Sequence, residues 1–259
     1  MGTLRSRVLA RGLTVGTFCG LGSPIAVEVI GGAGFDFLCL DAEHSPLDRG
    51  CLEGLIRAAD VSGTPAIVRV PGNGSDAIAT ALDSGAKGIL VPRVSTAEEA
   101  AAAVSAFRYP PQGKRGAGPG RSTIYGAKLM QYVASANDSL LLAIQVETAE
   151  AIENIESIVK VDGIDLIFIG PGDLSISLGL IGPADQAKLT EVIEKIVGVC
   201  QKAGKAVGLF RLSSVDVLRW VARGVTFFII GSDAMFLADG ALSTATAARQ
   251  VASNSVKSE

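Results

Sequence analysis

The chain has 259 residues and a net charge of −3, and 48% of its residues are hydrophobic, which is enough for a large core and excludes a disordered protein. Its basic residues form no stripe, and no apolar run reaches the length of a membrane span, so we expect neither a nucleic-acid nor a membrane partner. The four cysteines form no CxxC pair, which favours reduced thiols and a cytoplasmic location.

Short β-branched runs alternate with longer, Ala-rich amphipathic stretches along the whole chain. The short runs predict strands that are buried on both faces, as in a parallel sheet. They lie at about 14–18, 36–40, 66–70, 88–91, 140–146, 165–169, 206–210 and 226–230. The stretches between them predict helices at 24–33, 50–62, 75–85, 96–107, 148–159, 185–203, 213–222 and 233–249.

This alternation predicts the fold class. Eight strands separated by helices favour a single α/β domain, a (β/α)8 barrel of the TIM type, over a doubly wound open sheet. We expect the barrel to span 1–249 and a polar C-terminal tail to follow at 250–259. A capping-box pattern at Ser95 marks the start of the fourth helix. The irregular stretch 108–126 is rich in Pro, Gly and Arg, and its length indicates a functional segment.

Polar side chains stand where several of the predicted strands end, which is where barrels of this type carry their active sites. They are Asp41, Glu43 and His44 after the second strand, Arg69 at the end of the third, Gln145 and Glu147 at the end of the fifth, and Asp173 after the sixth.

His44 is the single histidine of the chain. An isolated histidine is often only structural, but this one follows two carboxylates at a strand end. A nearby aspartate would hold the imidazole and raise its basicity. We therefore expect His44 to act as a general base.

Gln145 and Glu147 are two positions apart on a strand, so both point to the same face. A glutamate that points into a barrel is unfavourable unless it is paired or binds a metal, so Glu147 is either a partner of Arg69 or a metal ligand. Asp173, in a Gly-Pro-Gly-Asp turn, is either a helix cap or a second ligand. Two carboxylates suit Mg²⁺, Mn²⁺ or Co²⁺, whereas a single histidine and unpaired cysteines argue against a structural zinc.

Arg69 is either an ion-pair partner in the core or, beside a metal-bound oxyanion, a group that stabilises a transition state. No lysine stands at the C-terminal end of a predicted strand. A Schiff-base aldolase needs such a lysine, so any activation of a carbonyl group would depend on the metal.

The segments that carry these residues resemble the HpcH/HpaI aldolase family. These are metal-dependent (class II) pyruvate aldolases, such as 2,4-dihydroxyhept-2-ene-1,7-dioate aldolase. The matching segments lie between about 12 and 180 and include GAGFDFLCLDAEHSP, RYPPQGKRG, IQVETAEAIENI and VDGIDLIFIGPGDLS. The DxEH, QxET and GPxDLS motifs are weak singly but specific in combination.

The resemblance implies a barrel of the phosphoenolpyruvate/pyruvate-binding kind, with a helix swapped between subunits and assembly as a hexamer, a trimer of dimers. It also implies a role for each site residue. Glu147 and Asp173 would bind the metal, His44 would be the acid/base residue, Arg69 would stabilise an enolate, and Gln145, Gly172 and Asp173 would hold pyruvate. Asp41 in the same site, and Asp83 from a neighbouring subunit, would support the basicity of His44.

The implied activity is that of a carbon–carbon lyase. It would cleave 4-hydroxy-2-oxo acids reversibly to pyruvate and an aldehyde through a metal-stabilised enolate. Phe18 and Gly172 depart from the commoner Trp and Ala of the family, which leaves the aldehyde open among succinic semialdehyde, tartronate semialdehyde and lactaldehyde.

Three alternative functions remain open. One is decarboxylation of oxaloacetate. Another is a citrate-lyase-like reaction on acyl-CoA esters, for which Arg108, Lys114, Arg115 and Arg121 would bind the CoA phosphates. The third is a binding protein without activity.

Overall fold

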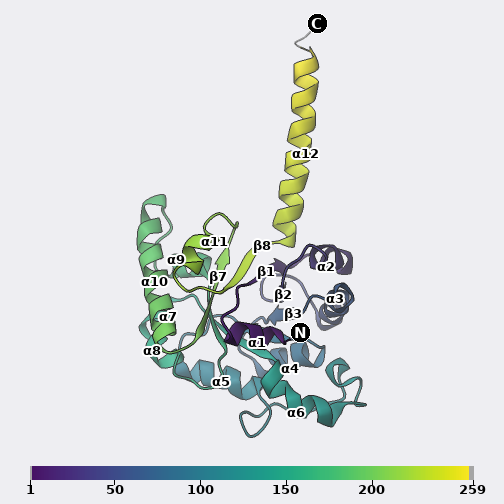
Figure 1. The fold of residues 1–259 in the computed structure, drawn as a ribbon, viewed down its shortest axis with the longest axis vertical. Helices are drawn as coiled ribbons and strands as arrows, with labels where there is room; N and C mark the ends of the chain where they lie inside the picture. The colour runs from purple at the N-terminus through teal and green to yellow at the C-terminus, as the bar shows by residue number, and fades with distance from the viewer. Residues whose placement is uncertain (1, 257–259) are drawn as a thin grey trace.

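The computed structural model describes residues 2–256, and its centre is a closed barrel of eight parallel strands. The strands are β1 (Thr14–Cys19), β2 (Phe37–Asp41), β3 (Ala66–Arg69), β4 (Gly88–Val91), β5 (Leu141–Val146), β6 (Leu166–Ile169), β7 (Ala206–Arg211) and β8 (Phe227–Ser232). Each strand pairs with the next, and β8 pairs with β1 (Figure 1). The predicted (β/α)8 barrel is confirmed, and the open sheet is excluded.

All eight predicted helices are present, with changed ends. The helices are α1 (Leu4–Leu9), α2 (Pro24–Gly31), α3 (Arg49–Ser62), α4 (Ser75–Asp83), α5 (Ala97–Phe107), α6 (Leu129–Ser139), α7 (Ala149–Glu153), α8 (Ile155–Ile158), α9 (Pro171–Ser177), α10 (Gln186–Lys202), α11 (Val217–Val221) and α12 (Asp233–Val256). The helix predicted at 148–159 is divided at Asn154, whose side chain donates to the Ser95 carbonyl oxygen. The sequence patterns did not predict α1, α6 or α9.

The capping residue of α5 differs from the prediction. Thr96, not Ser95, caps α5, because the Thr96 hydroxyl accepts a hydrogen bond from the backbone N–H of Glu99. The Glu99 carboxylate accepts in return from the backbone of both Ser95 and Thr96. The Ser95 hydroxyl is instead hydrogen-bonded to Thr148, and so links the β4–α5 loop to the end of β5.

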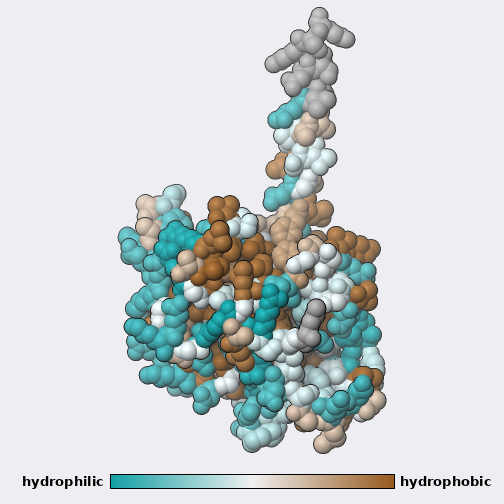
Figure 2. Space-filling model, in the orientation of Figure 1, coloured by the Kyte–Doolittle hydropathy of each residue, from teal (hydrophilic) through white to brown (hydrophobic). Residues whose placement is uncertain are grey.

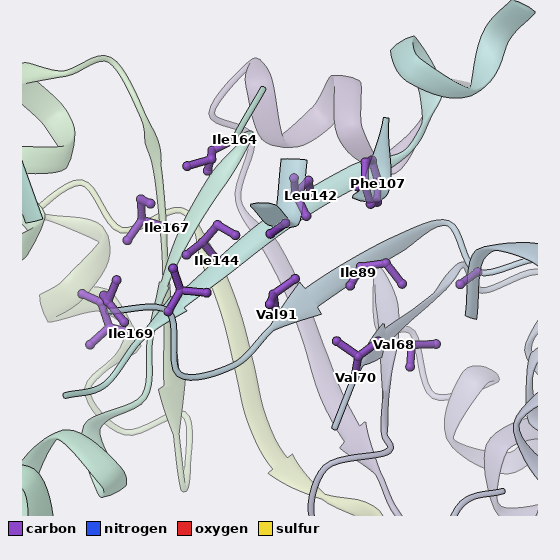
Figure 3. Close-up of a cluster of buried hydrophobic side chains, with 14 of the residues drawn as sticks. Val68, Val70, Ile89, Val91, Phe107, Leu142, Ile144, Ile164, Ile167 and Ile169 are labelled. Carbon is purple, nitrogen blue, oxygen red and sulfur yellow. The ribbon is translucent and has the colours of Figure 1, made fainter. Parts of the chain in front are cut away.

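Two apolar layers lie on either side of the strands. Leu142 and Ile144 of β5 pack with Ile167 in the layer between strands and helices, part of which Figure 3 shows. Leu141 and Ala143 belong to the cluster inside the barrel. This alternation directs Gln145 and Glu147 to the interior as well, as the two-residue spacing predicted.

The N-terminal end of the barrel is closed. Leu4 and Val8 of α1 pack against the interior cluster. Asp165, just before β6, accepts hydrogen bonds from Arg5 Nε at 2.9 Å and from Arg108 Nη2 at 2.8 Å. The opposite, C-terminal end of the strands therefore carries the cavities that open into the barrel.

The last helix does not lie against its own barrel. Figure 1 shows α12 projecting from the end of β8, and Figure 2 shows hydrophobic surface around its base. Phe236, Leu237 and Leu242 on this helix are exposed. The helix extends into the segment 250–259 that we predicted as a tail, and 257–259 lie outside the described residues. The division at 249 stays a prediction.

Within residues 2–256, no helix combines the length and the apolar character that a membrane span requires.

Candidate active site

Two adjoining cavities open at the C-terminal end of the barrel and share Asp173. One has a volume of about 270 Å³, and we call it the aromatic cavity. It is lined by Phe18, Asp41, Arg69, Gln145, Phe168, Gly170, Gly172, Asp173, Phe210, Gly231, Ser232 and Met235. The other, of about 330 Å³, is the polar cavity, lined by Glu43, His44, Arg93, Glu147, Thr148, Asp173, Ile176 and Ser177. All the predicted site residues except Asp83 line one cavity or both.

Glu147 is held in place from three sides. Its Oε1 accepts a hydrogen bond from the backbone N–H of Arg93 at 2.9 Å, and its Oε2 accepts from the side-chain amide of Gln145. A Cβ at Gly170 would lie 2.6 Å from Glu147 Oε2 and 2.9 Å from Gln145 Nε2. A larger residue at position 170 would displace these two side chains, so the glycine in the turn after β6 leaves the space that Glu147 occupies.

The charge on Glu147 has no counter-charge from the protein. Burial raises its pKa to about 7. The hydrogen bonds from Gln145 and Arg93 lower this pKa in part, whereas the nearby carboxylates of Asp173 and Glu43 raise it further. Among residues 2–256, neither Glu147 nor Asp173 forms an ion pair. The buried Gln145 Oε1 and Glu43 Oε2 also accept no hydrogen bond. A divalent cation that prefers oxygen ligands fits this set.

No three His, Cys, Asp or Glu side chains in the described part of the chain are grouped closely enough to hold a metal by themselves. The Glu147–Asp173 pair therefore fits a cation whose other ligands come from water or substrate.

Arg69 and Asp41 form a buried ion pair with two hydrogen bonds. Arg69 Nε donates to Asp41 Oδ1 at 2.9 Å and Nη2 donates to Oδ2 at 2.7 Å, and both side chains are 9% exposed. The Phe18 ring lies against the guanidinium, 4.3 Å from Cζ. Burial would raise the pKa of Asp41, but the hydrogen bonds and charge of Arg69 hold it below its usual value. Arg69 thus pairs with Asp41 and not with Glu147.

The surroundings of His44 differ from our expectation. Asp41 does not hold the imidazole: its Oδ1 accepts from the backbone N–H groups of Glu43 and His44, at 3.2 and 3.3 Å, because the chain turns tightly there. The carboxylate near the imidazole is that of Glu43, whose Oε2 is 3.7 Å from His44 Nε2 and 3.4 Å from Arg69 Nε. Burial raises the pKa of Glu43.

Glu43 and Arg93 are site residues to which we assigned no role. The DxEH motif contains Glu43, so its position was a usable signal. Arg93 stands in an ordinary loop sequence, Pro-Arg-Val-Ser, that carries no such signal.

Asp83 is separate from the other predicted site residues within one chain. It ends α4, at the N-terminal side of the barrel, and accepts a hydrogen bond from Arg115 Nη2 at 2.9 Å. A role in the site of a neighbouring subunit stays a prediction. Gly172 lines the aromatic cavity, and a Cβ added there would meet nothing within 4 Å, so the site tolerates the alanine of relatives.

The arginines considered for CoA phosphates are engaged elsewhere. Arg108 pairs with Asp165 at 2.8 Å, Arg115 with Asp83 at 2.9 Å, and Arg121 with Asp60 at 2.6 Å. They lie at the N-terminal side of the barrel, far from the two cavities. This arrangement argues against a CoA-binding pocket.

The family is decided by sequence comparison. The model of the HpcH/HpaI aldolase/citrate lyase family matches residues 14–240. The chain belongs to this family. It is 36% identical to the hydroxypyruvate/pyruvate aldolase of Roseovarius nubinhibens, over 93% of this chain and 95% of that protein. It is 37% identical to the 5-keto-4-deoxy-D-glucarate aldolase of Klebsiella pneumoniae, over 88% of this chain and 90% of that protein.

A solved structure agrees with these relatives. The crystal structure of a HpcH/HpaI aldolase/citrate lyase family protein from Burkholderia cenocepacia superposes with a TM-score of 0.89 at 30% identity, covering 95% of this chain and 98% of that chain. The predictions of a carbon–carbon lyase and of an aldolase are confirmed.

Proposed function

We propose that this aldolase cleaves 4-hydroxy-2-oxo acids reversibly to pyruvate and an aldehyde, with a divalent cation held by Glu147 and Asp173. The observation that carries the proposal is the buried Glu147, which shares a cavity with Asp173 and forms no ion pair. A buried carboxylate without a counter-charge is unfavourable. Binding of a divalent cation by Glu147 and Asp173 would supply that counter-charge. Mg²⁺, Mn²⁺ and Co²⁺ all suit two carboxylates.

The cation, when bound, would polarise the 2-oxo group and stabilise negative charge on its oxygen. The protein adds its own groups around the pyruvate part of the substrate. Arg69 uses Nε and Nη2 for Asp41, which leaves Nη1 to donate to the oxygen as its charge develops. The backbone N–H groups of Gly172 and Asp173, in the first turn of α9, are free for the substrate carboxylate. Gln145 orients the pyruvate part and also positions Glu147.

His44 moves the protons. Its exposed imidazole removes the proton of the 4-hydroxyl group, directly or through one water. The C3–C4 bond then breaks, its electron pair stays on C3 as the enolate of pyruvate, and C4 leaves as the aldehyde. A proton from water adds to C3 and completes pyruvate, and the protonated His44 returns its proton to the solvent. Glu43, 3.7 Å from Nε2, stabilises the protonated imidazole.

Decarboxylation of oxaloacetate would need the same cation but no general base, because its C4 carboxylate carries no hydroxyl proton to remove. The placement of His44 in the polar cavity beside Glu147 therefore favours the aldol reaction over the decarboxylation.

We also propose a cytoplasmic hexamer, a trimer of dimers. All four cysteines are free thiols. The exposed Phe236, Leu237 and Leu242 on the projecting α12 favour packing on a neighbouring subunit. The family resemblance suggests that Asp83 supports His44 of such a neighbour. Light scattering on the intact chain should give six times the chain mass of 26.5 kDa. A fully active monomer would contradict this assembly.

Exchange of the pyruvate methyl hydrogens tests the proposed function most directly. With Mn²⁺ in deuterated buffer, NMR should show loss of the methyl signal, because enolisation is half of the aldol reaction. EDTA should reduce the exchange to the background rate, and added Mn²⁺ should restore it. Exchange that persists in EDTA would show that the cation is not needed and would refute the proposal.

A further inference from the structure

The polar cavity contains an arginine that the folding of the barrel does not explain. Arg93 follows β4, is exposed, and lines this cavity together with His44 and Glu147. Among the side chains of residues 2–250, none forms a hydrogen bond, ion pair or ring contact with its guanidinium, whereas Arg69 of the aromatic cavity uses Nε and Nη2 to bind Asp41. The positive charge of Arg93 is therefore available to a ligand.

The backbone of Arg93 is strained. Its φ is 55°, in the left-handed region, where a side chain costs about 1–2 kcal/mol. The conformation lets its N–H donate to Glu147 Oε1 at 2.9 Å. Glycine would make the same hydrogen bond without strain. An arginine at this position therefore indicates that the side chain itself contributes to the site.

The proposed reaction decides which part of the substrate meets Arg93, so this inference rests on the proposed function. The groups assigned to pyruvate, Arg69, Gln145 and Gly172, line the aromatic cavity. His44, assigned to the 4-hydroxyl proton, lines the polar cavity. Because C4 must lie beside His44, the part of the substrate beyond C4 extends into the polar cavity with Arg93.

The charges in the polar cavity restrict what that part can be. Once the cation neutralises Glu147 and Asp173, Glu43 is the remaining carboxylate of the cavity lining, and Arg93 is the cationic group there apart from a protonated His44. A guanidinium binds a carboxylate through two parallel hydrogen bonds. We infer that Arg93 binds a carboxylate at the far end of the acceptor aldehyde, so that this aldolase prefers the semialdehydes of dicarboxylic acids to neutral aldehydes.

Two acceptors of equal chain length test the inference. Initial rates of aldol addition to pyruvate are measured with Mn²⁺ for succinic semialdehyde and for butanal, and the ratio of their kcat/KM values is compared among variants. The intact chain should favour succinic semialdehyde at least tenfold. Arg93→Gln should lower the ratio by about 10-fold to 100-fold, the effect of one charge-assisted contact. Arg93→Lys should keep most of the preference.

Arg49→Gln is the matched control. Arg49 is also exposed and begins α3, so it lies at the same end of the barrel but outside both cavities. Its removal should leave the ratio unchanged. If Arg93→Gln lowers kcat/KM equally for both acceptors, Arg93 only balances the charge of the site, and the inference is overturned. Equal kcat/KM values for the two acceptors in the intact chain would overturn it as well.

Exchange of the pyruvate methyl hydrogens separates the two possible failures. If the intact chain exchanges the methyl hydrogens but does not discriminate between the two acceptors, only the inference about Arg93 is overturned. Absent exchange by the intact chain overturns the proposed function and this inference with it. Thermal unfolding shows that each variant is folded. Arg93→Gln and Arg93→Lys carry the same backbone strain, so a difference between their kcat/KM ratios is due to the charge of the side chain.

Discussion

Replacing Glu147 by Gln is expected to reduce metal-dependent pyruvate release on the order of 10³-fold, and Asp173→Asn should have a similar effect. Each substitution removes one of the two negative charges that would hold the cation. Glutamine keeps the size of the side chain and can still accept the hydrogen bond from the Arg93 N–H. The loss should therefore come with weaker metal binding, measured by calorimetry with Mn²⁺. Glu150→Gln, at an exposed position on α7, is the control and should keep full activity.

Stability separates this loss from misfolding. Burial raises the pKa of Glu147 from 4.5 to about 7, so the metal-free folded chain loses stability, relative to the unfolded chain, as pH rises from about 4.5 through 7. Above pH 7 the ionised carboxylate costs roughly 3 kcal/mol, and near pH 4.5 it costs little. Glu147→Gln removes this cost. The metal-free variant should thus unfold several degrees higher than the unmodified chain at pH 8, with little difference at pH 5.

Two results would contradict the assignment. One is Glu147→Gln with full activity and unchanged Mn²⁺ affinity. The other is a variant that is less stable than the unmodified chain at pH 8, which would mean that Glu147 is a structural group.

Replacing Arg69 by Gln is expected to have the second-largest effect, on activity and stability together. Asp41 would remain buried without its partner, and breaking such a pair typically costs about 3–5 kcal/mol. The enolate would also lose its cationic donor, so kcat/KM for aldol cleavage should fall about 10²-fold to 10³-fold. Urea unfolding and initial rates measure the two effects.

The double variant Asp41→Asn with Arg69→Gln distinguishes the two roles. Two amides in place of the ion pair leave no buried charge, so most of the lost stability should return. Activity should stay low, because no positive charge replaces Arg69. If activity returns with stability, Arg69 has only a structural role. If Arg69→Gln alone retains activity within tenfold, the guanidinium does not stabilise the enolate.

The sequence by itself determined the barrel and the placement of most site residues. Runs of buried strand residues alternate with helical periodicity, and eight such units favour a closed barrel over an open sheet. The two-residue spacing of Gln145 and Glu147 places both side chains inside the barrel because alternate strand residues point the same way. Polar groups at strand ends must meet, because parallel strands carry all their C-terminal ends to one side.

The tertiary structure alone decided the partners within the site. Asp41 bonds to Arg69 and to its own turn instead of the imidazole, because β2 and β3 place residues 41 and 69 side by side. Arg93 enters the polar cavity because its left-handed backbone binds Glu147, 54 positions away. Such contacts depend on strand register and on the turn of each loop, which residue patterns along the chain do not encode.

The same reason applies to the last helix. The periodicity of the segment from Asp233 predicts a helix, but not whether the helix covers its own barrel. The direction of α12 is set at its first residue, where the Asp233 carboxylate accepts hydrogen bonds from the backbone N–H groups of Gly20 and Leu21 after β1. This contact joins opposite ends of the chain, so only the closed barrel determines it.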